Sequence, residues 1–350
     1  MGSRFAVVAI LTVFPVVMGC GRAGSPAVSP TATRSYEKDE AKPTVEGRLP
    51  PTGPATPSPK PPARLLAFDF IDADHGWVAF GNEDAADLLN TADGGQSWSV
   101  VTSFDEPVIS LDFTSLGHGW LATEEALVDT ADGGRTWNPV AVPSGSSPIR
   151  DVLFIDGGRG WLVYGGGIIT TLDGGSTWSP IADPCTLRPP ALTFVDALNG
   201  WAGCGGVGAT AMQPKQLYRT TDAGQDWQLI SCACFDTQTP IVAGKMPWRG
   251  HLTGLSFFDE THARMSSNGG GLDATTDGAL SWKFLPTGVD CGEEFISASQ
   301  LLSPKMGYVI AEYGAITRLL GTRDGGSTWS SLYPSLIESC STPELRASSR

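Results

Sequence analysis

The sequence predicts an all-β fold, a β-propeller built from four-stranded blades. A pattern of Thr-x-Asp-(Gly/Ala)-(Gly/Ala)-x-(Ser/Thr/Asp)-Trp occurs six times. The six motif tryptophans are spaced by 39, 41, 49, 55 and 47 residues, and short β-prone segments fill each interval. Periods of about 40–50 residues with four strands are typical of propeller blades. The 43 glycines and 11 tryptophans suit many short strands with tight turns and aromatic anchors.

The N-terminus reads as an export signal. Arg4 precedes the apolar run 5–18, which is shorter than the roughly 20 residues that span a bilayer. Residues 17–20, Val-Met-Gly-Cys, resemble a bacterial lipobox, so we expect a lipoprotein signal peptide over 1–19 and lipidation of Cys20. The alternative is an ordinary signal peptide followed by an incidental cysteine.

A linker and the propeller follow this signal. Residues 20–63 start with the lipidated cysteine and are rich in Pro, Ser and Thr, so we expect a disordered tether that holds the domain away from a membrane. The propeller is expected over 64–340, with a disordered tail over 341–350.

Each repeat contains four expected strands. In the first unit these are 65–72, which alternates apolar and polar residues, then 75–80, 87–91 and 98–101. The next four units begin at 108, 149, 191 and 252, with a degenerate second strand near 263–266, and the sixth begins at 295. A single blade cannot bury both faces, so the ring is the folding unit. We expect six blades; a seventh would require strands from the linker.

The repeated motif is interpreted as a turn between the third and fourth strands of each blade. Its glycines allow positive φ, and its carboxylate is expected to accept hydrogen bonds from turn N–H groups. Because the six copies point in six directions, they are assigned a structural role rather than a catalytic or metal-binding one. The motif residues are Asp93, Trp98, Asp132, Trp137, Asp173, Trp178, Asp222, Trp227, Asp277, Trp282, Asp324 and Trp329.

The motif resembles the Asp-box, or bacterial neuraminidase repeat, of sialidases, some glucanases and sortilin-type receptors. The added Gly-Trp or Gly-Tyr on the second strand makes residues 64–334 most similar to the photosystem II assembly and stability factor group and its exported bacterial relatives. The resemblance implies a propeller that assists membrane-protein partners. That group typically uses a basic surface patch, whereas this chain carries a net charge of −14. The acidity also disfavours nucleic-acid binding.

An enzymatic function has weaker support in the sequence. The chain lacks the Arg-Ile-Pro motif of sialidases, although Arg64 stands just before the first strand. Glycosidases need two facing carboxylates, and the candidates Asp290, Glu293 and Glu294 do not single out a pair. An exported sialidase-like glycosidase or a glycan-binding lectin therefore remains the alternative.

Binding is expected on the face that carries the loops between blades, where the longest loops belong to units four to six. Trp and Arg anchor many interfaces, so the candidate binding residues are Trp248, Arg249 and His251. The alternative for Trp248 is packing of its loop onto the ring. Cysteines gather in the same sector, and we expect Cys291 to pair with Cys340, and Cys185 with Cys232 or Cys234, which leaves Cys204 for the other.

Together these features predict a non-catalytic, protein-binding or assembly scaffold. We expect it to be exported and held at the outer face of a bacterial membrane, or in the periplasm, by its lipid anchor alone. Its partners are expected to be proteins at or near the membrane, with a glycan as the alternative. No cofactor and no metal are expected.

Overall fold

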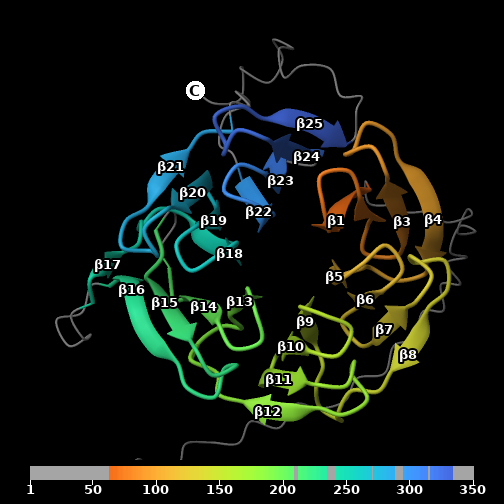
Figure 1. The fold of residues 1–350 in the computed structure, drawn as a ribbon, viewed down its shortest axis with the longest axis horizontal. Coiled ribbons are helices and arrows are strands. Elements are labelled where there is room, and N and C mark those ends of the chain that lie inside the picture. The colour runs from red at the N-terminus through yellow and green to blue at the C-terminus, as the bar shows by residue number, and fades with distance from the viewer. Residues whose placement is uncertain are drawn as a thin grey trace, which may run out of the picture. The chain divides into compact units, whose positions relative to one another are not determined.

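The computed structural model describes residues 63–208, 212–234, 242–269, 271–287, 295–313 and 316–333. These residues form 25 strands in six sheets, with no helix among them, arranged as a ring around a common centre (Figure 1). The prediction of an all-β propeller with six blades is confirmed. Because these ranges contain no helix, they also contain no helical segment that could cross a membrane.

The first four strands of each blade form an antiparallel sheet and follow one another in chain order. The strands of blades one to three are β1 (Arg64–Phe70), β2 (Gly76–Gly81), β3 (Ala86–Thr91), β4 (Ser99–Phe104), β5 (Ser110–Phe113), β6 (Gly119–Ala122), β7 (Leu127–Thr130), β8 (Asn138–Val140), β9 (Ile149–Phe154), β10 (Gly160–Tyr164), β11 (Gly167–Thr171) and β12 (Ser179–Ile181). Those of blades four to six are β13 (Ala191–Phe194), β14 (Gly200–Gly205), β15 (Lys215–Thr220), β16 (Gln228–Ala233), β17 (Gly244–Lys245), β18 (His251–Phe257), β19 (Ala263–Asn268), β20 (Gly271–Thr275), β21 (Lys283–Leu285), β22 (Phe295–Leu301), β23 (Gly307–Tyr313), β24 (Ile316–Thr322) and β25 (Ser330–Tyr333).

The first strand of each blade lies innermost, and the fourth lies at the rim (Figure 1). Blade four differs from the expectation because a fifth strand, β17, pairs in parallel with β16 at the outer edge. All four strands of blade six come from one continuous stretch, so the ring closes through side chains rather than through a shared strand. At that junction the Leu65 N–H donates to Thr317 Oγ1 at 2.8 Å, and the Phe70 N–H donates to Gln300 Oε1 at 2.9 Å.

The core between blades is built by the aromatic residue that opens the second strand. It stacks on the aromatic residue that ends the first strand of the next blade, with ring centroids 3.5–4.0 Å apart. The stacked pairs are Trp77–Phe113, Trp120–Phe154, Trp161–Phe194, Trp201–Phe257 and Tyr308–Phe70. These rings are nearly inaccessible to solvent, whereas the six Asp-box tryptophans are only half-buried.

Blade five lacks this aromatic stack and has a hydrogen bond to the next blade in its place. Arg264 occupies the position of the tryptophan, and Leu301 replaces the partner phenylalanine. The Arg264 Nη2 donates to the Gly325 carbonyl of the next Asp-box at 3.1 Å. Trp77 makes the equivalent bond with its Nε1, at 3.2 Å from the Gly133 carbonyl. The buried guanidinium therefore makes the hydrogen bond that the Trp77 indole makes in blade one, whereas the buried Nε1 atoms of Trp120 and Trp161 have no hydrogen-bond partner among the described residues.

Polar side chains link neighbouring innermost strands. In five of the six blades, the residue before the final aromatic residue or leucine of the first strand accepts a hydrogen bond. The donor is the backbone N–H of the final aromatic residue or leucine in the first strand of the next blade. The accepting and donating residues are Asp69 and Phe113, Asp112 and Phe154, Thr193 and Phe257, Ser256 and Leu301, and Gln300 and Phe70. Blade three has Leu153 at this position, so the junction between blades three and four lacks a side-chain acceptor there.

The Asp-box forms the turn between the third and fourth strands in every blade. The threonine hydroxyl donates to the Asp Oδ1 at 2.7–2.9 Å and accepts the N–H of the second Gly or Ala at 2.9–3.0 Å. Both Gly/Ala positions have positive φ, including Ala223 and Ala279. The first of them also donates to the turn between strands one and two of its own blade, as from Gly133 to the Gly117 carbonyl at 2.9 Å. The Asp-boxes and these turns therefore share one face of the ring, here called the Asp-box face.

Candidate functional site

The opposite end of blades four and five carries the connector between β16 and β18, which contains Trp248 and Arg249 and leads into His251 at the start of β18. A buried lysine that sequence reasoning missed holds this connector. Lys215 opens β15 with no solvent exposure. Its Nζ donates to the carbonyls of Pro247, Trp248 and Arg249 at 3.1, 3.3 and 2.9 Å. Burial lowers the pKa of this ammonium to about 8, because the charged form loses water.

The Arg249 side chain is anchored from a second direction. It forms an ion pair with Asp273 of β20, a carboxylate with almost no exposure, while about two-fifths of the Arg249 side chain stays exposed. The guanidinium also lies over the Phe284 ring of β21, 4.5 Å from its centroid. Burial raises the pKa of the Asp273 carboxyl, and Arg249 and Lys215 oppose that rise. Arg249 is therefore presented in a fixed orientation, which lowers the entropy cost of using it in binding.

Trp248 and His251 are both half-buried rather than exposed. Trp248 is half-buried and packs against the core cluster that contains Trp201, Met246 and Met265. Its carbonyl accepts the Gln213 N–H at 3.0 Å. His251 is half-buried at the start of β18, next to Gly208. Trp248 therefore fixes the connector on the ring, as its alternative interpretation requires, and Arg249 is the member that projects toward solvent.

Exposed apolar side chains lie at the same end of blades four and five as Arg249. Val207 and Met212 flank a loop of blade four, and Met212 forms a bridge to Gly250. Phe284 lies under the Arg249 guanidinium, and Leu187 lies in the connector before β13. We call Leu187, Val207, Met212, Arg249 and Phe284 the connector surface. Four apolar side chains that are 44–78% exposed, at the same end of the blades as one oriented arginine, make a surface suited to a protein partner.

The disulfides of this sector correct one prediction. Cys185 pairs with Cys204, with Cα atoms 5.3 Å apart, and Cys232 pairs with Cys234, with Cα atoms 5.5 Å apart. The expected pairing of Cys185 with Cys232 or Cys234 is therefore wrong. The end of β14 brings Cys204 to the connector that enters blade four, so Cys185 meets it within the distance that a disulfide spans. The proposed partners Cys291 and Cys340 lie outside the described residues, as does Cys20.

The centre of the ring contains a cavity of about 750 Å³, lined by the six innermost strands and by Arg188 and Gln213 of the connector sector. Three carboxylates reach it from blades one to three. Burial raises the pKa of Asp69 and of Asp151 to about 6, although hydrogen bonds oppose the rise. Burial also raises the pKa of Asp112 well above its usual range, and the charges of Asp69 and Asp151 add to this.

These carboxylates resemble part of a glycosidase site, where one acid has a raised pKa beside a second carboxylate. Their oxygens, however, are used between blades. Asp69 accepts from the Phe113 N–H at 2.7 Å and from the Gln300 amide. Asp112 accepts from the Phe154 N–H, and Asp151 accepts from the Ser110 hydroxyl at 2.7 Å. A structural role accounts for all three. Asp290, Glu293 and Glu294, the candidates from the sequence, lie outside the described residues.

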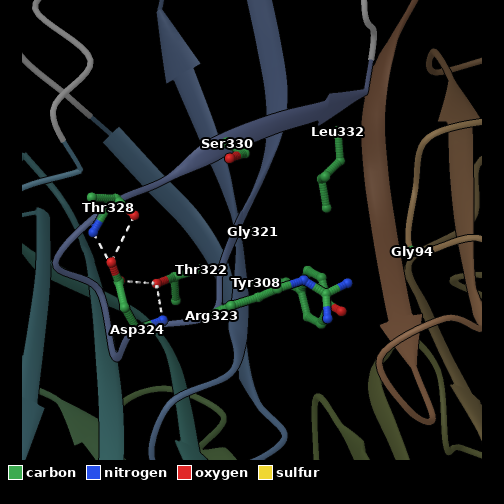
Figure 2. A pocket seen from close by; sticks show the side chains of 9 residues that line it. All are labelled: Gly94, Tyr308, Gly321, Thr322, Arg323, Asp324, Thr328, Ser330 and Leu332. Atoms are coloured by element: carbon green, nitrogen blue, oxygen red, sulfur yellow. Dashed lines mark hydrogen bonds between the residues drawn. The ribbon is translucent and has the colours of Figure 1, made fainter.

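A smaller cavity of about 210 Å³ lies between blades six and one, beside the last Asp-box (Figure 2). Figure 2 shows the Asp324 carboxylate turned toward Thr322 and Thr328, to which it is hydrogen-bonded. Arg323 donates to the Ala73 carbonyl at 3.1 Å. Burial raises the pKa of Tyr308, whose ring is stacked on Phe70, to about 12. The groups around this cavity therefore act in blade packing. In the part of the chain that the structure describes, no three His, Cys, Asp or Glu side chains are placed to hold a metal ion.

Comparisons with known proteins agree with this architecture. A family model described as photosynthesis system II assembly factor YCF48 matches residues 99–229. The chain is an Asp-box β-propeller similar to YCF48. The solved structure "YCF48 bound to D1 peptide" aligns with a TM-score of 0.50 and 22% identity, over 81% of this chain and 86% of that chain. This likeness shows the fold.

Two further structures align over most of this chain. YCF48 from Cyanidioschyzon merolae has a TM-score of 0.48 and 18% identity, covering 79% of this chain and 86% of its own. A GH74 xyloglucanase from Xanthomonas campestris has a TM-score of 0.49 and 16% identity, covering 77% of this chain and 47% of its own. No curated protein matches the chain.

Proposed function

We propose that this protein is a non-catalytic, exported lipoprotein whose propeller binds a protein partner at or near the membrane and assists its assembly. The observation that carries the proposal is the connector surface, where Lys215 and Asp273 hold Arg249 among exposed apolar side chains. A preorganised arginine inside an apolar surround is a common form of interface anchor. The similar protein YCF48 has been solved with a bound D1 peptide, which supports peptide or protein binding by this kind of propeller.

Site-specific photo-crosslinking tests the binding surface in the full chain. A photoreactive residue at the exposed Met212 should yield a discrete adduct with one membrane-associated protein, and Arg249→Ala should reduce that adduct. Val100, exposed on the outer strand β4, is the matched control position. Identical adducts from both positions, or none from Met212, would contradict binding at the connector surface.

The anchor requires a separate test, because Cys20 lies outside the described residues. Metabolic labelling with an alkyne fatty acid should modify the wild-type protein and leave Cys20→Ala unlabelled. A wild-type chain that takes up no lipid would refute the lipoprotein assignment without affecting the binding surface.

The second candidate function is an exported glycosidase, favoured by the raised pKa of Asp112 beside two other cavity carboxylates. The release of reducing sugar from a panel of β-glucans and sialosides measures it. The scaffold proposal predicts no turnover. Turnover that Asp112→Asn abolishes, with the fold intact, would replace the scaffold proposal by the enzyme.

A further inference from the structure

The Asp-box face carries a second group of exposed apolar side chains. Among the described residues, five large hydrophobic side chains project from its turns with 41–68% of their surface exposed. They are Leu116, Leu172, Leu198, Phe258 and Leu280. All five belong to blades two to five. In blades one and six the positions equivalent to Leu116, Leu172, Leu198 and Leu280 hold polar, charged or small residues or proline, as in Ala73, Asp74 and Lys305, and the positions equivalent to Phe258 hold the half-buried Ile71 and Leu302.

The turns that carry these side chains form a continuous surface across the four blades. The His118 ring of blade two lies against Gly157 of blade three. The Arg159 Nη1 of blade three donates to the Ala197 carbonyl of blade four at 2.8 Å. Arg219 of blade four forms an ion pair with Glu260 of blade five at 2.9 Å. Neighbouring blades are thus in contact at this face, through a hydrogen bond or ion pair in two of the three cases, and the five apolar side chains stand on adjacent turns of the Asp-box face.

The charge around this apolar group is negative. Hydrogen bonds within the turns lower the pKa values of seven carboxylates in blades two to five, which therefore stay ionised at neutral pH: Asp132, Asp156, Asp173, Asp196, Asp222, Asp259 and Asp277. Burial opposes this shift, and in Asp259 it is the largest single effect. Glu260 and Asp226 add further acidic groups.

The nearby cations offset this charge only in part, because they are fewer than the carboxylates. Arg159 and Arg219 link neighbouring turns. Arg135 donates to the carbonyl of Asp132 in its own Asp-box at 2.7 Å. Lys283 stands at the edge of this region, on β21. A partner that supplied cations would meet carboxylates that hydrogen bonds within the turns hold in fixed orientations, as at Asp132, Asp173 and Asp277.

We infer that the Asp-box face of blades two to five, carrying Leu116, Leu172, Leu198, Phe258 and Leu280, docks a basic amphipathic segment of a partner protein. The apolar side chains of such a segment would cover these five exposed side chains, and its lysine or arginine side chains would face the carboxylates. An anionic lipid surface has the wrong charge for this face. The site is separate from the connector surface, because the two lie at opposite ends of the blade strands.

A defined peptide tests this docking. The probe is a fluorescent peptide with leucine and lysine at amphipathic helical spacing, titrated into the full-length protein and followed by anisotropy. The expected result is binding that weakens as salt rises, since exposed ion pairs are screened within about 10 Å at 0.1 M salt. The triple variant Leu116→Ser/Leu172→Ser/Leu198→Ser should weaken binding about tenfold, the equivalent of about 1.4 kcal/mol. Because these side chains are exposed, the variant should fold normally.

The matched control is Val100→Ser, which removes an exposed apolar side chain from β4 of blade one, outside both proposed surfaces. It should leave peptide binding unchanged. Hydrogen exchange should show protection at residues 114–118 and 195–199 in the complex. Equal loss in both variants, equal binding of a peptide with glutamate in place of lysine, or preference for anionic vesicles would overturn the inference. Crosslinking at Met212 reports separately on the proposed function. Failure of peptide docking at the Asp-box face and failure of partner binding at the connector surface can therefore be told apart.

Discussion

The carboxylate of Asp151 is predicted to destabilise the folded ring at neutral pH. Its side chain accepts from the Ser110 hydroxyl at 2.7 Å and from the Val152 N–H at 2.9 Å. Burial nevertheless raises its pKa from 3.8 to about 6. The folded protein thus binds this proton more tightly than the unfolded chain, and the stabilising contribution is lost as pH rises from about 4 through about 6. At about 1.4 kcal/mol per tenfold change in proton affinity, the cost at pH 7.5 is about 3 kcal/mol.

Asp151→Asn removes this cost and keeps both hydrogen bonds, because the amide oxygen still accepts. We expect the variant to gain up to about 3 kcal/mol in the free energy of unfolding at pH 7.5 and most of that gain to vanish by about pH 4. Urea unfolding followed by tryptophan fluorescence at both pH values measures the difference. Asp151→Leu is the control, since it also removes the charge but leaves the Ser110 hydroxyl without this acceptor. An Asn variant with the same stability change at both pH values would refute the assignment of a raised pKa.

Three further predictions concern the connector and the blade contacts. Lys215→Met should accelerate amide exchange at residues 246–250 through loss of three hydrogen bonds and leave the Asp-box of the same blade, residues 220–227, unchanged; equal exchange in wild type and variant would exclude this role. Arg264→Ala should cost about 2–3 kcal/mol in urea unfolding by removing a charged donor from the interior, whereas the exposed Arg135→Ala should stay within about 0.5 kcal/mol of wild type. Non-reducing peptide mapping should recover Cys185 linked to Cys204, and a link from Cys185 to Cys232 or Cys234 would contradict the structure.

The repeat made the fold predictable, because each Asp-box marks one turn and each Gly-Trp marks the strand that packs against the next blade. The degenerate second strand of blade five was found from spacing alone. Aligning the repeats places His262-Ala263-Arg264 beside His75-Gly76-Trp77, so that Arg264 stands at the tryptophan position. The sequence gives no direct sign that Arg264 reaches the carbonyl that an indole reaches elsewhere, because that depends on the distance between two blades.

The connector was located from its length, but its internal contacts were not. Lys215 looks like an ordinary exposed lysine at the start of a strand, yet three backbone carbonyls of a segment more than 30 residues later converge on its ammonium. The cysteine pairing failed for a similar reason. Bracketing a blade in sequence suggested Cys185 with Cys232 or Cys234, whereas the register of β14 carries Cys204 to the loop that contains Cys185. Such contacts between residues far apart in the sequence depend on strand register, which composition and motif spacing do not determine.

The departures from the repeat collect in blades four to six, and the contacts explain how the ring tolerates them. Arg264 replaces a tryptophan and keeps its hydrogen bond to the next Asp-box. Tyr308 replaces another and keeps the stacking on Phe70, with ring centroids 3.7 Å apart. Each of these side chains makes one contact with the adjacent blade, a hydrogen bond for Arg264 and ring stacking for Tyr308. Blades one to three keep the regular Trp–Phe stack. Because these repeated contacts lie between blades and not in the connector, the ring and the connector depend on separate sets of residues.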